Sequence, residues 1–149
     1  MDVTILDATE ADAGELLTVQ RAAYVAEGAL YDSFTIPPLV ETLDGVRAAI
    51  RDSTVLKAVT GTRIVGSVRG LRVGPDCHVG RLAVAPDLQG NGIGTALLRA
   101  IEQRFPDVTR FELFTGNKSE ANLRLYRRLG YVDRPADHPI LTYLVKTRG

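Results

Sequence analysis

The residues best suited to chemistry lie in a glycine-rich segment, Gln89-Gly90-Asn91-Gly92-Ile93-Gly94-Thr95. Its alternating glycines permit unusual backbone angles and let a ligand approach the main chain without a Cβ in the way. A strand is predicted before the segment and a helix after it. Unpaired amides and the helix dipole at such a helix N-terminus favour a bound phosphate. The segment therefore indicates either a pyrophosphate-binding loop or a plain glycine-rich turn.

Two familiar nucleotide-binding loops do not fit this segment. The dinucleotide pattern G-x-G-x-x-G fails because Thr95 stands where the third glycine belongs. The Gly-Lys-Ser/Thr of a P-loop is also missing. A dinucleotide-binding protein is thereby disfavoured.

A second motif lies about thirty residues downstream, in a predicted helix that contains Tyr126. Together the two motifs resemble the GNAT acetyltransferase superfamily over roughly residues 77 to 132. The family signature Q/R-x-x-G-x-G/A is matched by Gln89, Gly92 and Gly94, and L-Y-x-x-x-G-F/Y by 125–131. The resemblance implies an enzyme that transfers acetyl from acetyl-CoA to a primary amine of a small molecule or peptide, by direct attack in a ternary complex. The alternative is a non-catalytic acyl-CoA-binding or sensory module with the same fold.

The resemblance also assigns the residues that would bind acetyl-CoA. Main-chain groups of Leu82, Ala83 and Val84 would bind the pantetheine arm like an added strand. The pyrophosphate would be held by Gln89, Gly90, Asn91, Gly92, Ile93, Gly94 and Thr95. An asparagine that often contacts the cofactor in the family is replaced by Ser119, which can still hydrogen-bond the cofactor or can act as a helix N-cap; Asn117 or Asn122 can also substitute.

Tyr126 occupies the position of the family's general acid, which protonates the departing coenzyme A thiolate. A helical tyrosine that only packs against leucines is the alternative. Phe114 stands where several members carry a glutamate as general base. Glu112, His78 or a water relay without a dedicated base remain open for that role.

The first predicted helix and the loop after it are expected to bind the acceptor. Tyr24, Glu27, Tyr31 and Phe34 combine acidic and aromatic groups that suit a protonated amine. The segment 133–139 is expected to form the other wall.

The elements around these motifs predict one α/β domain over residues 1–149, with a GNAT-like acyl-CoA acyltransferase fold. A mixed, mostly antiparallel sheet with helices on both faces is expected. Strands are predicted at 3–7, 54–60, 63–73, 77–84, 109–115, 131–132 and 140–146. Helices are predicted from the capping box 9–12 onwards and near 43–50, 93–101 and 119–129. Segment 33–39 is expected to be a loop because it contains two prolines.

Composition limits the partners. Lysine plus arginine (18) equals aspartate plus glutamate (18), so no overall field attracts nucleic acid or an anionic membrane. Cys77 is the only cysteine, and with His78 and His138 it gives no metal-ligand spacing, so no metal is expected. Absence of a disulfide and of any leader pattern favours a cytoplasmic location. A homodimer is left open.

Overall fold

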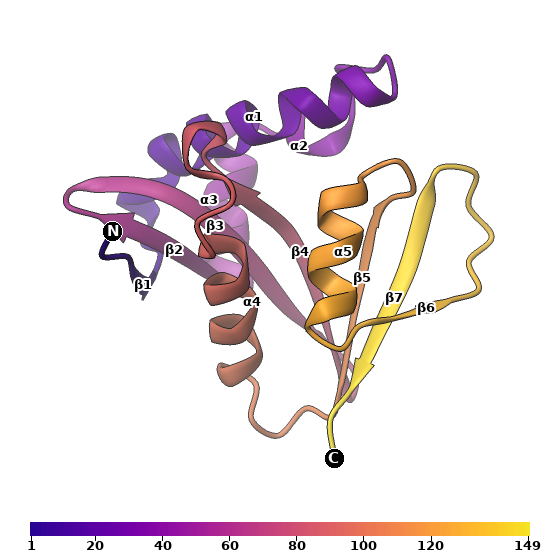
Figure 1. Ribbon diagram of the computed structural model, residues 1–149. Coiled ribbons are helices and arrows are strands. Elements are labelled where there is room, and N and C mark those ends of the chain that lie inside the picture. The colour runs from indigo at the N-terminus through magenta and orange to yellow at the C-terminus, as the bar shows by residue number, and fades with distance from the viewer.

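Seven strands form one mixed sheet in the computed structural model, which describes residues 1–149 (Figure 1). Along the sheet the strands follow the order β1-β2-β3-β4-β5-β7-β6. They are β1 (Thr4–Asp7), β2 (Thr54–Thr60), β3 (Arg63–Val73), β4 (Asp76–Val84), β5 (Arg110–Gly116), β6 (Val132–Arg134) and β7 (Leu141–Thr147). Neighbours run antiparallel except for β4 and β5, which are parallel. The predicted mixed, mostly antiparallel sheet is confirmed.

Helices cover both faces of this sheet, as predicted (Figure 1). The helices are α1 (Ala13–Leu30), α2 (Pro37–Val40), α3 (Leu43–Asp52), α4 (Ile93–Gln103) and α5 (Glu120–Arg128), with short 3₁₀ turns η1 (Glu10–Asp12) and η2 (Pro86–Leu88). In Figure 1, α4 and α5 lie in front of the sheet, whereas α1 and α3 lie behind it. None of the helices combines the length and apolarity needed to cross a membrane.

The prediction that segment 33–39 is entirely loop was wrong. Pro37 and Pro38 occupy the first two positions of the short helix α2. Proline is tolerated there because the first backbone N–H groups of a helix have no intrahelical acceptor, so nothing is lost when they are missing. The residues before Pro37 do form an irregular connection.

Side chains of the central strands alternate between two hydrophobic cores. Leu56 and Val65 belong to a cluster of 19 buried residues beneath α4, whereas Val55 and Ile64 belong to a cluster of 7 beneath α1 and α3. This division follows from the two-residue period of a strand, which sends successive side chains to opposite faces. The sheet is therefore held between two helical layers.

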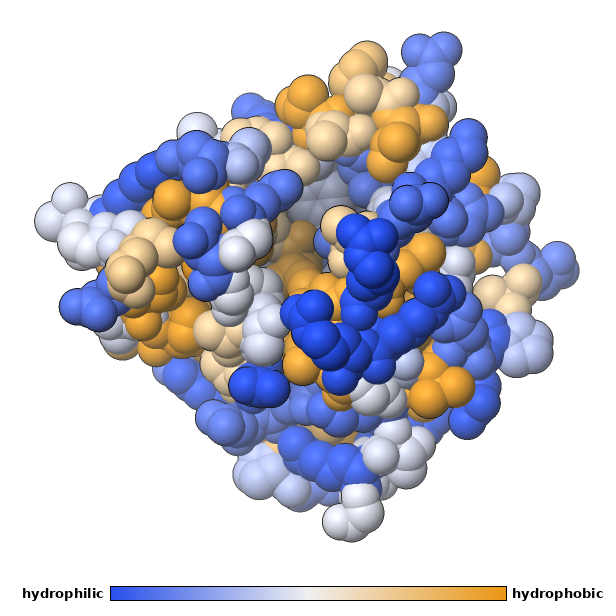
Figure 2. Space-filling view, in the orientation of Figure 1, coloured by the Kyte–Doolittle hydropathy of each residue, from blue (hydrophilic) through white to orange (hydrophobic).

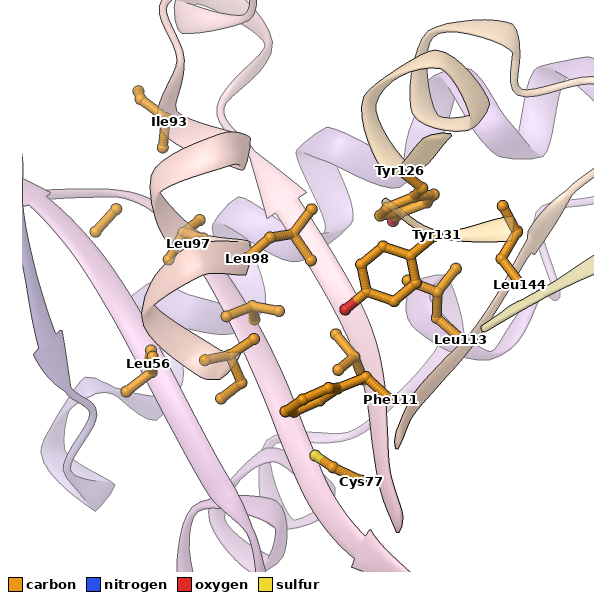
Figure 3. Close-up of a cluster of buried hydrophobic side chains, with 14 of the residues drawn as sticks. Leu56, Cys77, Ile93, Leu97, Leu98, Phe111, Leu113, Tyr126, Tyr131 and Leu144 are labelled. Carbon is orange, nitrogen blue, oxygen red and sulfur yellow. The ribbon is translucent and has the colours of Figure 1, made fainter. Parts of the chain in front are cut away.

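The larger core joins α4, β5 and the turn after α5 (Figure 3). Leu98 of α4 points toward Tyr131, which lies beside Leu113 of β5. The Tyr131 hydroxyl donates a hydrogen bond of 2.9 Å to the buried Glu102 carboxylate, and the Lys146 ammonium lies 2.8 Å from the other oxygen. The one charge in this core is thus paired.

Cys77 lies in the same core and is fully buried (Figure 3). Burial raises the pKa of its thiol to about 11. Cys77 therefore packs as a small buried hydrophobe.

Two glycine substitutions test this packing. A Cβ on Gly70 would lie 2.7 Å from Phe105 Cε2 and 2.9 Å from Ile101 Cγ1. We expect Gly70→Ala to lower the free energy of unfolding by about 1–3 kcal/mol through overpacking. Gly14, in the first turn of α1, has nothing within 4 Å of the corresponding position. Gly14→Ala is expected to raise the free energy of unfolding by about 0.4–1 kcal/mol. Urea denaturation measures both, and equal stabilities would contradict the packing described.

Candidate active site

A bulge in β4 shapes the site. Opposite the single residue Val68 of β3, β4 carries two residues, Arg81 and Leu82. Arg81 has a φ of 54°, in the left-handed region. Such a bulge bends its strand and disrupts pairing nearby. On the other side of β4, pairing with β5 is confined to Cys77 and His78, and the two strands then diverge (Figure 1).

The divergence leaves peptide groups of β4 without a strand partner. The Ala85 N–H donates to the Val65 carbonyl of β3 at 2.8 Å. Because peptide groups alternate in direction along a strand, those of Leu82 and Val84 face away from β3, into the gap. The Tyr24 hydroxyl of α1 donates to the Leu82 carbonyl at 2.9 Å. The remaining groups can pair with an extended ligand.

A groove of about 320 Å³ runs along this gap to the glycine loop. Figure 2 shows it as a hollow between α4 and α5, with hydrophilic residues of α5 along the rim. Ten of the predicted cofactor residues line it: Leu82, Ala83, Val84, Gln89, Gly90, Gly92, Ile93, Gly94, Thr95 and Asn122.

The other two predicted cofactor residues, Asn91 and Ser119, do not line the groove. The Asn91 side-chain amide donates to the Leu88 carbonyl at 2.9 Å and so braces the loop from within. The Ser119 hydroxyl donates to Glu27 Oε1 at 2.5 Å. Ser119 therefore joins α5 to α1.

The loop has the backbone geometry of an anion cradle. Gly90 and Gly92 have φ values of 82° and 80°, and Gly92 is the N-cap of α4. A Cβ on Gly94 would lie 3.1 Å from Leu125 of α5, so glycine keeps this approach open. The first-turn amides of α4 have no intrahelical acceptor and border the groove. These features fit a pyrophosphate.

Two arginines in the groove wall were missed in the sequence. Arg124 and Arg128 of α5 both line it, and Arg128 Nη2 lies 3.3 Å from Thr95 Oγ1. They supply positive charge beside the loop, which suits an anionic ligand. Their spacing of four residues on a predicted helix, four residues being about one turn, was the only available signal.

A second cavity, of about 410 Å³, adjoins the groove. Tyr24, Glu27, Leu82 and Asn122 line both spaces and mark their junction. Tyr31, predicted to bind the acceptor along with Tyr24 and Glu27, also lines the second cavity. Phe34, the fourth predicted acceptor residue, is 58% exposed and lies outside the lining.

Tyr126 lines the second cavity from α5. Its side chain is buried and its hydroxyl has no hydrogen-bond partner within the protein. Burial, followed by the nearby Tyr24 and Glu27, raises the pKa of the Tyr126 phenol well above its ordinary value. Burial also raises the pKa of Tyr24 to about 12. Both phenols are therefore protonated at neutral pH and can act as proton donors.

The two candidate bases lie side by side where β4 and β5 pair. His78 lines the second cavity, whereas Glu112 does not. One Glu112 oxygen accepts a 2.6 Å hydrogen bond from the Tyr143 hydroxyl, and the other lies 3.8 Å from His78 Nδ1. Glu112 thus stands behind His78 as seen from the cavity.

The segment before β7 contributes the opposite wall through His138, Ile140 and Leu141. His138 Nδ1 accepts the backbone N–H groups of Ile140 and Leu141, each at 3.1 Å. In the neutral ring the proton is then on Nε2. The predicted wall at 133–139 matches only at His138, and no sequence pattern singled that residue out.

Comparison with known proteins agrees with this geometry. The acetyltransferase (GNAT) family model matches residues 24–131. A 75-residue segment is 33% identical to an uncharacterized N-acetyltransferase of Methanocaldococcus jannaschii, spanning 48% of this chain and 48% of that relative. The fold is similar to PaiA N-acetyltransferase from Thermoplasma acidophilum in complex with coenzyme A (TM-score 0.86, 16% identity, 99% of both chains).

A second solved structure, the ribosomal-protein-S18-alanine N-acetyltransferase from Escherichia coli, has a TM-score of 0.76 at 15% identity, over 99% of this chain and 97% of that one. The predicted GNAT-like fold is confirmed by these likenesses. With the family model matching residues 24–131, the chain belongs to the acetyltransferase (GNAT) family.

Proposed function

We propose that this protein transfers an acetyl group from acetyl-CoA to a primary amine of a small molecule or peptide. The observation that carries the proposal is the junction of two spaces. A groove with free strand amides and an anion cradle opens into a cavity with a buried phenol in its wall. An extended, pyrophosphate-bearing thioester fits the groove, and an acceptor fits the cavity.

The chain's own groups account for cofactor binding. The peptide groups of Leu82 and Val84 that face the gap would pair with the amide-rich pantetheine arm. The first-turn amides of α4 would hold the pyrophosphate, and the charges of Arg124 and Arg128 would neutralise it. Bound acetyl-CoA would supply a thioester carbonyl carbon for the acceptor amine to attack.

Tyr126 would act as the general acid. Its hydroxyl has no partner in the protein, so it is free to donate a proton to the leaving sulfur. Its raised pKa keeps the proton on the phenol oxygen throughout the neutral and mildly alkaline range. Tyr24, which holds the Leu82 carbonyl, would instead fix α1 against the bulge.

We propose that the amine loses its proton chiefly to water. Glu112 is engaged by Tyr143 and stands outside the cavity wall. His78 lines the cavity but makes no hydrogen bond into it, so it would assist a water relay and not replace it. An amine must be neutral to attack, and a lysine-like amine is mostly protonated at pH 7.

The loop assignment is tested by a matched pair of substitutions at Gly92. Acetyl-CoA at a hundredfold excess over its dissociation constant should stabilise the protein by about 2.7 kcal/mol. Gly92→Asp should abolish this stabilisation by placing negative charge against the phosphates. Asparagine tolerates the left-handed backbone about as well as aspartate but carries no charge, so Gly92→Asn should retain most of the stabilisation. Thermal melting with and without acetyl-CoA measures both. A wild-type shift in the aspartate variant would reject the loop as the pyrophosphate site.

The role of Tyr126 is tested by Tyr126→Phe. Because the hydroxyl has no partner in the protein, its loss should leave folding and acetyl-CoA affinity unchanged. The kcat should fall on the order of a hundredfold, as for loss of a general acid. Tyr143→Phe, which removes a hydroxyl outside both cavities, should keep a near-wild-type kcat. Thiol release with an amine present measures both. Full turnover in Tyr126→Phe would show that Tyr126 serves only in packing. If the wild-type protein releases no thiol, the alternative of a non-catalytic acyl-CoA-binding module is favoured.

The pH profile tests the water relay. With a lysine-like amine, kcat/KM should rise nearly tenfold per pH unit from pH 6 to 9, following the neutral amine fraction. Tyr126 should not cut off this rise, since its raised pKa keeps it protonated. His78→Ala and Glu112→Gln should alter the profile only modestly. A flat profile, or collapse of activity in either variant, would reveal a dedicated base instead.

A further inference from the structure

Arg81, the residue at the β4 bulge, is a cation without a hydrogen-bonding partner. Its side chain is 27% exposed, and its Nε is fully buried with no hydrogen bond. The terminal nitrogens also lack partners in the protein but are not fully buried. The other arginines without hydrogen bonds, Arg99, Arg124 and Arg134, are exposed to solvent, where water serves them. Arg81 alone is half-buried and unsatisfied.

The nearest carboxylate cannot serve Arg81 fully. Glu41 Oε1 lies 3.7 Å from Arg81 Nε, beyond hydrogen-bond distance. Arg69 already donates to both Glu41 oxygens, at 2.6 and 3.0 Å, and Gln20 donates to one of them at 3.0 Å. Burial pushes the pKa of Glu41 upward, but these hydrogen bonds and the two arginine charges hold it below its ordinary value. The single Glu41 carboxylate thus lies beside two guanidinium groups, so the cluster carries one excess positive charge.

This excess charge lies beside the acceptor cavity. Arg81 lines the second cavity and also a third one, of about 430 Å³, that Asp52 and Arg69 border; it is absent from the lining of the cofactor groove. Within the lining of the second cavity, Glu27 is the only acidic residue. Its carboxylate accepts a hydrogen bond from Ser119 and makes none with Arg81. A bulge redirects its side chains, which explains how a charged residue of β4 comes to border this cavity.

Its backbone also argues for a role. A φ of 54° is rare for residues with a side chain, and glycine or asparagine would adopt it more easily. Its guanidinium makes only a long ion pair with Glu41 and no hydrogen bond, so the packing does not satisfy it. An incompletely paired, half-buried guanidinium is unfavourable unless a ligand satisfies it.

We propose that Arg81 binds an anionic group on the acceptor, so that the amine substrate also carries a carboxylate or phosphate. The inference rests on the proposed acetyl transfer. The planar guanidinium fork matches either group through paired hydrogen bonds, which neutral or purely cationic amines cannot offer. Free amino acids are the simplest compounds of this class.

The experiment compares acceptors that differ only in this group. Free amino acids are tested against their carboxamides, and phosphoethanolamine against ethanolamine, by following thiol release from acetyl-CoA. We expect the anionic member of a pair to have a KM lower by about 10- to 100-fold, the worth of a hydrogen bond to a charged group, with a similar kcat. Preference within the amino acid pairs identifies a carboxylate, and preference for phosphoethanolamine identifies a phosphate.

Substitutions then assign the preference to Arg81. Arg81→Asn suits the left-handed backbone and removes the charge; it should raise KM for the anionic amine about 10- to 100-fold and leave the neutral partner unchanged. Comparing the same compounds in both proteins cancels differences in amine basicity. Arg81→Lys should keep part of the preference. Arg127→Asn, which removes a surface charge paired with Asp133, is the control and should change nothing.

Calorimetric titration of the same compounds into the coenzyme A-loaded protein keeps the two proposals apart. If no amine promotes thiol release, the proposed function fails, yet tighter binding of the anionic compound, lost in Arg81→Asn, still supports the Arg81 site. Equal binding of anionic and neutral partners overturns the inference. So does an Arg81→Asn variant that weakens every amine alike, because a purely structural role would act in that way.

Discussion

In an antiparallel pair, two residues facing one cannot both join the ladder, and this mismatch at Val68 sets the geometry of the whole site. It bends β4 away from β5 after a short parallel contact. It also leaves the peptide groups of Leu82 and Val84 facing a gap. A buried peptide group without a partner costs about 1–3 kcal/mol, so the gap must stay accessible to water or ligand. The groove follows from this requirement.

The helices hold the gap open without filling it. Tyr24 of α1 satisfies one of the exposed carbonyls, and Glu27, one turn later, accepts a hydrogen bond from Ser119 ahead of α5. Gly116 permits this approach, since a Cβ there would collide with Glu27 and Tyr31. Helices α1 and α5 are thus linked to each other across the end of the sheet, while α5 packs in the larger core and α1 in the smaller one.

Much of this arrangement was predictable because it depends on local patterns. The alternating glycines, the helical stripe around Tyr126 and the alternation of apolar and polar residues in the strands can all be recognised from residues close together in the sequence. Contacts between distant segments were not predictable: Ser119 and Glu27 are 92 residues apart, so a serine expected near the cofactor proved to hold α1. The bulge could not be placed to the residue either, because a register shift depends on both strands. Arg81 was overlooked for that reason, and Phe34 was included only for its proximity in sequence.

The placement of Cys77 has a practical consequence for anyone following the reaction. Its sulfur is sealed between the sheet and α4, and a thiol with a pKa of about 11 contains little reactive thiolate at neutral pH. A chromogenic disulfide reagent will therefore report released coenzyme A with almost no background from the native protein. When the core opens, the same reagent titrates one sulfur per chain. A single dye thus counts turnovers in the folded protein and unfolding events in the denatured one.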